Sequence, residues 1–246
     1  MSKSNSDSII QQITGQPHWE LSYRPDTFVK DRIPLSECVN LVEKNEVHLR
    51  GWPFPYAREN HAARSTKESS IGSWIEFRSH IEYWRMFQSG QFYYASTIRE
   101  TVDSEWDREI KSAMSNHLEV RGVDIKTIPG FISIINTIYS ISEYIEFLSR
   151  ITQKMKIADN ITIKVGLSRV QGFALGADKD RAWMSLCQTD EVNLERSITH
   201  SAINLISNTQ EISLKMVIWF FERFGWLEPN IDAIKEDQRK FLAKIM

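Results

Sequence analysis

The sequence predicts one α+β domain with a mixed or antiparallel sheet packed by two main helices. Short runs of alternating apolar and polar residues occur in blocks, without the regular strand-helix alternation of a doubly wound sheet. Two long segments, residues 129–156 and 209–225, repeat apolar residues at helical spacing. The chain has 246 residues, of which 41% are hydrophobic and 25% charged, so it can bury a sizeable core.

The remaining elements follow from the same two periodicities. Residues 1–8 are polar, and we expect a disordered tail there, followed by a single domain over residues 9–246. Strands are expected at residues 18–24, 47–51, 72–78, 91–99, 161–170, 182–187 and 192–198, and further helices at residues 35–44 and 230–245.

Four segments give weaker signals. Residues 57–70 are polar and predict a loop, whereas residues 80–88 fit either a helix or a strand. Residues 101–126 are charged and irregular, which predicts a long connection with at most a short helix. Residues 172–176, Gly-Phe-Ala-Leu-Gly, predict a hairpin turn, and the aspartates at 178 and 180 are expected in a turn as well.

Composition narrows the class of protein. The formal net charge of −2 does not favour a protein coated with phosphate contacts, although a local basic patch would still permit nucleic-acid binding. The two cysteines, Cys38 and Cys187, lie in apolar surroundings, so we expect buried free thiols. The chain opens without an apolar leader and contains no run of about 18 apolar residues. We therefore expect a cytoplasmic protein.

The sequence contains no complete catalytic or metal motif. Glycine-rich phosphate loops and a GxSxG elbow are absent, and the six histidines are scattered without an i, i+4 pair. We therefore expect no catalytic residue, no metal and no cofactor. One alternative stays open: Glu76, His80 and Glu82 are close in sequence and could hold Mg²⁺ or Mn²⁺ in a metal-dependent nuclease or related hydrolase.

Residues 48–100 concentrate aromatic and arginine side chains. Eleven of the chain's 27 aromatic residues lie between Trp52 and Tyr94, with arginines interleaved. Such a composition fits a core in which the polar ends of these side chains are hydrogen-bonded, a protein interface, or a ligand pocket. As candidate ligand- or partner-binding residues we take Arg50, Trp52, Trp84 and Arg85. An internal role is the rival for two of them, with Arg50 paired to Glu76 or Glu82 and Trp52 in the core.

Four short pieces of sequence carry a resemblance. They are the Leu-Arg-Gly-Trp-Pro-Phe-Pro run at 49–55, Trp-Arg at 84–85, the Gln-Ser-Gly-Gln-Phe run at 88–92 and the Glu-Arg-Phe-Gly-Trp run at 222–226. In this order they are similar to a region found C-terminal to AlbA-like, Schlafen-type nucleic-acid-binding domains in bacterial proteins. The resemblance spans residues 45–245, so we expect no AlbA-like domain here and carry over neither its nucleic-acid binding nor any active site.

Together these observations favour a non-enzymatic binding or assembly module of a bacterial regulatory or defence-type system. Its aromatic and arginine-rich surface is expected to bind a protein partner or a second copy, with nucleic acid less favoured by the net charge. If the apolar face of the helix at 209–225 belongs to the core, Trp219→Ala should cost about 3–5 kcal/mol of stability.

Overall fold

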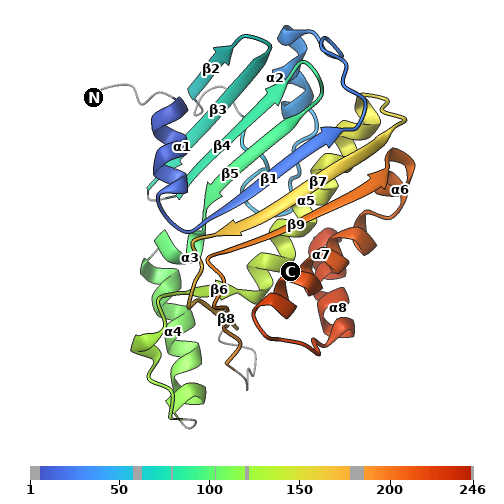
Figure 1. Ribbon diagram of the computed structural model, residues 1–246. Coiled ribbons are helices and arrows are strands. Elements are labelled where there is room, and N and C mark those ends of the chain that lie inside the picture. The colour runs from blue at the N-terminus through green and yellow to red at the C-terminus, as the bar shows by residue number, and fades with distance from the viewer. Residues whose placement is uncertain are drawn as a thin grey trace.

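The computed structural model describes residues 6–57, 63–78, 80–102, 104–119, 122–177 and 186–244. Within them the chain forms an α+β structure built on an antiparallel sheet in the order β2-β3-β4-β5-β1-β7-β9 (Figure 1). This confirms the predicted fold class. The strands of this sheet are β1 (His18–Pro25), β2 (Ala63–Lys67), β3 (Ser70–Phe77), β4 (His80–Phe87), β5 (Phe92–Thr97), β7 (Asn160–Ser168) and β9 (Asn193–Ser201).

Helices cover both faces of the sheet. Figure 1 shows α1 (Ser6–Thr14) against one face, while α5 (Ile134–Lys154) runs across the other. Helix α7 (Thr209–Arg223) packs on α5. The other helical elements are α2 (Leu35–Glu43), α3 (Arg99–Val102), α4 (Ser104–Glu119), the 3₁₀ turn η1 (Ile125–Thr127), α6 (Ala202–Ser207) and α8 (Ile231–Leu242).

The main core lies between the sheet and α5. Apolar residues of β1 that alternate along the strand, Trp19, Leu21 and Tyr23, face α5 and are buried with it. A smaller cluster on the opposite face joins Ile9 and Ile13 of α1 to side chains of β3, β4 and β5. Because α1 begins at Ser6 and buries Ile9, helix occupies the last three residues of the tail that the sequence predicted to be disordered.

The uncertain segment at 80–88 is strand β4, and its ambiguity has a physical cause. Both faces of this strand are covered, so its inward and outward residues are both buried. Tyr83 belongs to the cluster under α1, whereas Trp84 belongs to the core under α5. The sequence of β4 therefore shows no clear alternation of polar and apolar residues.

Helix α5 begins at Ile134, later than the predicted start at 129. Residues Phe131–Ser133 instead form strand β6, which pairs in parallel with β8, Ala174–Gly176. Ser133 caps the helix, since its Oγ accepts a hydrogen bond of 3.1 Å from the backbone N–H of Asn136. Residues 172–176 thus end in a short strand, and the prediction of a simple hairpin turn was wrong.

Other sequence predictions need correction. Polar residues 63–67, expected in a loop, form the edge strand β2, whose exposed position needs no apolar side chains. The expected strand at 47–51 is reduced to an isolated bridge between Val47 and Phe54. The region 101–126 contains the 16-residue helix α4. Of the strand expected at 182–187, residues 182–185 lie outside the described residues, as do those at 178 and 180.

The expectation about the two cysteines is met. Cys38 and Cys187 are both buried and free. Among the described residues, no helix has both the length and the apolar character that a membrane span requires.

Candidate functional site

A cavity of about 450 Å³ lies between the α5 face of the sheet and the N-terminal half of α5. This volume falls within the range typical of small-molecule sites. The chain between β1 and β2, the end of β3, strands β4 and β5, and helix α3 complete its walls. The lining residues are Trp19, Arg50, Gly51, Trp52, Phe54, Phe77, Arg78, His80, Glu82, Tyr94, Ser96, Thr97, Arg99, Glu100, Val102, Ile132, Asn136, Thr137, Ser140, Glu143 and Tyr144.

Strand register builds the floor of this cavity. Ser96 of β5 is paired with Trp19 of β1 on one side and with Glu82 of β4 on the other. Directly paired residues of antiparallel strands point to the same face, so these three side chains form one row beneath α5. The row places a carboxylate, a hydroxyl and an indole side by side at the bottom of the cavity.

Glu82 is buried and held by the segment that closes the cavity. Its Oε1 accepts a hydrogen bond of 2.6 Å from the backbone N–H of Tyr56, and its Oε2 accepts one of 3.3 Å from Nε1 of Trp52. His80 Nε2 lies 3.9 Å from the same Oε2, and His80 Nδ1 lies 3.3 Å from Thr97 Oγ1. The acid thus joins the aromatic segment at 52–56 to the sheet.

Glu143 and Arg50 form an ion pair on the α5 side. Nε of Arg50 lies 3.2 and 3.1 Å from the two carboxylate oxygens, Nη2 contacts Oε2, and Nη2 also donates to Ser140 Oγ at 3.3 Å. The Glu143 side chain is 1% exposed and that of Arg50 is 28% exposed. Burial alone would lower the pKa of Arg50, but the charge of Glu143 offsets this and raises that pKa.

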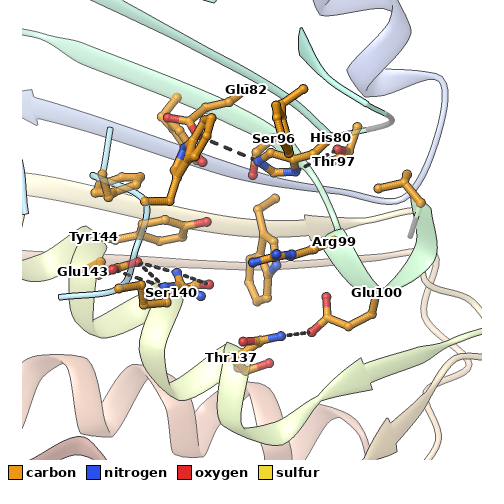
Figure 2. Close-up of a pocket in the computed structure, with 18 of the residues that line it drawn as sticks. His80, Glu82, Ser96, Thr97, Arg99, Glu100, Thr137, Ser140, Glu143 and Tyr144 are labelled. Atoms are coloured by element: carbon orange, nitrogen blue, oxygen red, sulfur yellow. Dashed lines mark hydrogen bonds and ion pairs between the residues drawn. The ribbon is translucent and has the colours of Figure 1, made fainter. Parts of the chain in front are cut away.

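Glu100 is the third buried carboxyl group of the cavity, at the end formed by α3. Its Oε1 accepts a hydrogen bond of 2.9 Å from Nδ2 of Asn136 on α5, the pair that a dashed line joins in Figure 2. Burial raises the pKa of the Glu100 carboxyl, and the hydrogen bond from Asn136 opposes this only in part.

Two tyrosine hydroxyl groups add further polar atoms. Burial raises the pKa of both Tyr94 and Tyr144, and the negative charge of Glu82 raises each pKa further. Tyr94 of β5 and Tyr144 of α5 both line the cavity, with 5.6 Å between their ring centres. Neutral hydroxyls at this position can donate to a ligand and accept from it.

The mouth of the cavity carries aromatic and cationic groups. Phe77 is 54% exposed, and the guanidinium of Arg78 lies 5.7 Å from its ring centre. Arg99 is exposed and lies 5.2 Å from the ring centre of Trp106. Figure 2 shows Arg99 extending between His80 and Ser96 on the sheet side and Thr137 on α5. Among the described residues, neither arginine has a carboxylate partner.

The structure places two of the four predicted binding residues in this cavity, Arg50 and Trp52. Arg50 is paired internally, as the rival reading held, but with Glu143 and not with Glu76 or Glu82. Trp52 is partly exposed, stacks on Tyr56 with ring centres 4.5 Å apart, and therefore lines the cavity without filling the core.

Trp84 and Arg85 do not line this cavity. Trp84 is fully buried and donates from Nε1 to the carbonyl oxygen of Tyr56 at 2.8 Å. Arg85 points to the opposite face of the sheet, is 9% exposed, and donates to the hydroxyls of Tyr83, Ser70 and Ser65. Both residues therefore hold the sheet together and do not offer the exposed surface expected of them.

The sheet separates the three residues of the alternative nuclease hypothesis, Glu76, His80 and Glu82. Strand β3 pairs Ile75 with Glu82 and Glu76 with Ile81, so Glu76 lies on the face opposite to Glu82 and His80. Within the part of the chain that the structure describes, no group of three or more histidine, cysteine, aspartate or glutamate side chains could hold a metal ion.

Sequence reasoning missed Arg78, Arg99, Glu100 and Glu143 as members of a site. Arg78 and Arg99 lay within the arginine-rich stretch, but no local spacing distinguished them from its other arginines. Glu143 offered a usable signal, since it is an acid among isoleucines on the apolar face of α5 and would need a partner there. No local pattern points from Glu143 to Arg50, which is 93 residues away.

Comparisons of the chain with protein-family models, with curated proteins and with solved structures each found no match.

Proposed function

We propose that this chain is a binding module whose ligand is a small molecule held in the cavity between the sheet and α5. The observation that carries the proposal is the lining of this cavity, in which buried carboxylates and hydroxyls lie beside aromatic rings. Such sites combine apolar walls with a few well-placed polar groups that fix the orientation of a ligand. The resemblance to the region C-terminal to AlbA-like domains supports a role in a bacterial regulatory or defence-type system.

The polar groups of the cavity are fixed before any ligand arrives. Glu82 is held by two donors from the segment at 52–56, and Glu143 is held by Arg50 and shares that arginine with Ser140. A ligand that fits therefore does not have to order these side chains, which lowers the entropic cost of binding. This preorganisation favours recognition.

A thermal-shift screen of metabolites tests the proposal. Some compounds should raise the melting temperature of the wild-type protein, because a ligand that binds only the folded state stabilises it. Trp52→Ala should lose this shift, because Trp52 lines the cavity. Phe28→Ala is a matched control, since Phe28 is an exposed aromatic residue outside the cavity. Shifts that survive in Trp52→Ala, or no shift with any compound, would contradict the proposal.

A hydrolase remains the second candidate, and one contact favours it. His80 lies 3.9 Å from Glu82 at the floor of the cavity, and a histidine beside a carboxylate is a common acid-base pair. Incubation of the protein with DNA and RNA in the presence of Mg²⁺ or Mn²⁺ tests this reading. If the wild-type protein cleaves nucleic acid and His80→Ala does not, the protein is an enzyme and the proposal of a binding module is wrong.

A further inference from the structure

A buried carboxyl group lies at the floor of the cavity. Glu82 of β4 is 2% exposed and lines the cavity beside Trp52 and His80. Its carboxylate oxygens accept from Trp52 and Tyr56 and have further lone pairs, so a ligand group placed against Glu82 is favoured when it supplies an N–H or O–H donor. The ligand should therefore carry a donor on the part that reaches Glu82.

The walls next to Glu82 favour a flat ring. Trp52 stacks on Tyr56, and its ring centre lies 5.7 Å from that of Phe77. Trp19 of the floor contacts Tyr144 edge to face, with 6.4 Å between ring centres. Aromatic faces of this kind stack with planar heterocycles, each contact being worth about 1–3 kcal/mol for a nucleic-acid base.

The mouth carries the opposite charge from the interior. Arg78 and Arg99 are exposed, lie over aromatic rings that hold their guanidinium groups in place, and have no carboxylate partner among the described residues. Guanidinium groups bind phosphate through two parallel hydrogen bonds, which makes arginine well suited to this anion. The ligand should then combine a donor that meets Glu82 with an anionic group that meets these arginines.

We propose that the cavity binds a nucleotide whose base carries an exocyclic amino group, with the amino group facing Glu82 and the phosphate facing Arg78 and Arg99. This inference rests on the proposed function and names the ligand class. Adenine, guanine and cytosine offer an amino donor to this carboxylate. Uracil offers carbonyl oxygens on either side of a single N–H, so it should be disfavoured there.

Calorimetric titration of the full chain tests the proposal. GMP, AMP, CMP and UMP serve as probes, with the corresponding nucleosides and inorganic phosphate as comparisons. At least one amino-bearing nucleotide should bind about tenfold or more tightly than UMP, and about tenfold more tightly than its nucleoside or phosphate alone. Equal binding of UMP, or nucleotide binding no tighter than inorganic phosphate, would overturn the proposal.

Variants separate the two ends of the ligand. Arg99→Ala should weaken nucleotide binding about tenfold and leave nucleoside binding unchanged, because only the phosphate contact is lost. Arg223→Ala is the matched control, since Arg223 is exposed and lies 5.5 Å from the ring centre of Trp219, far from the cavity lining. Glu82→Gln should weaken nucleotide and nucleoside alike. Equal effects of Arg99→Ala and Arg223→Ala would contradict the assignment of the phosphate.

Binding experiments distinguish a wrong nucleotide assignment from a cavity that binds no ligand. If another class of compound stabilises the wild-type protein through Trp52 and no nucleotide binds, the cavity is a ligand site and the nucleotide assignment is wrong. If no compound of any class binds in a Trp52-dependent way, the proposed function fails together with this inference.

Discussion

Arg50 and Glu143 form a largely buried ion pair that joins the connection after α2 to the middle of α5. The two residues are 93 positions apart, and a further hydrogen bond from Arg50 to Ser140 attaches the arginine to a second residue of α5. The pair also forms one wall of the cavity. An arginine from the aromatic and arginine-rich stretch thus shapes the candidate site from inside the structure.

Arg50→Ala should therefore destabilise the protein strongly. Removing one partner of a buried pair leaves the other charge without compensation, and we expect a loss of about 3 kcal/mol in urea unfolding. The value lies at the low end of the usual range because the Arg50 side chain is 28% exposed.

The double variant Arg50→Ala, Glu143→Gln provides the control for this prediction. Because glutamine is neutral, the second change should recover part of the stability lost by the first. Arg239→Ala, which breaks an exposed pair with Glu236, should leave the free energy of unfolding almost unchanged. A loss of the same small size in Arg50→Ala would show that water compensates the Glu143 charge.

The helix α7 yields a second prediction, which corrects the sequence-based one. Trp219 is only partly buried, because it lies at the edge of the core between the guanidinium groups of Arg196 and Arg223. Its neighbour Phe220 is 1% exposed and contacts Trp19 edge to face. Phe220→Ala should cost about 3–5 kcal/mol, and Trp219→Ala clearly less, in denaturant titrations of both variants. An equal loss for the two would contradict this placement of Trp219.

The elements that the sequence predicts most clearly are those that bury one face and expose the other. Strand β1 and helices α5 and α7 have one apolar face each, so their periodicity is visible. Strand β4 is buried on both sides and β2 is an exposed edge, and neither shows a clear alternation. Helix α4 was missed because its many charged residues obscured the buried residues Ile110, Met114 and Leu118.

The candidate site was harder to predict than the fold. Its composition was partly visible, since Arg50 and Trp52 were singled out from the aromatic and arginine-rich stretch. Its geometry depends on pairings between distant segments, such as Asn136 with Glu100 and Trp19 with Ser96. Local spacing carries no information about such pairings, and it also suggested a grouping of Glu76 with Glu82 that the strand register prevents.

The cysteines give a third prediction, on chemical reactivity. Burial raises the pKa of Cys38 to about 11, and it also raises the pKa of Cys187. A thiol with such a pKa is almost entirely protonated at neutral pH, and the thiolate is the reactive form. Titration with a thiol-specific reagent should detect two thiols in denaturant and neither of them in the native protein within minutes. Rapid reaction of the native protein would show that one of them is accessible.

The last prediction concerns the dependence of stability on pH. Burial raises the pKa of Glu100 in the folded protein above its ordinary value of 4.5, although Asn136 and backbone hydrogen bonds oppose the change. Between the unfolded and folded pKa values, the folded state holds a proton that the unfolded state has lost. The contribution of Glu100 to stability is therefore fully present below about pH 4.5 and declines as the pH rises through the folded pKa.

Glu100→Gln should remove this decline, because glutamine stays neutral and its carbonyl oxygen can still accept the hydrogen bond from Asn136. Urea unfolding at several pH values from 4 to 8 should thus show a stability difference, variant minus wild type, that grows as the pH rises. Other buried acids of the cavity, Glu82 and Glu143, are present in both proteins and cancel in this difference. Glu195→Gln on the exposed strand β9 should show no such growth. A Glu100→Gln difference that stays constant or falls with pH would mean that Glu100 ionises at least as readily in the folded chain as in the unfolded one.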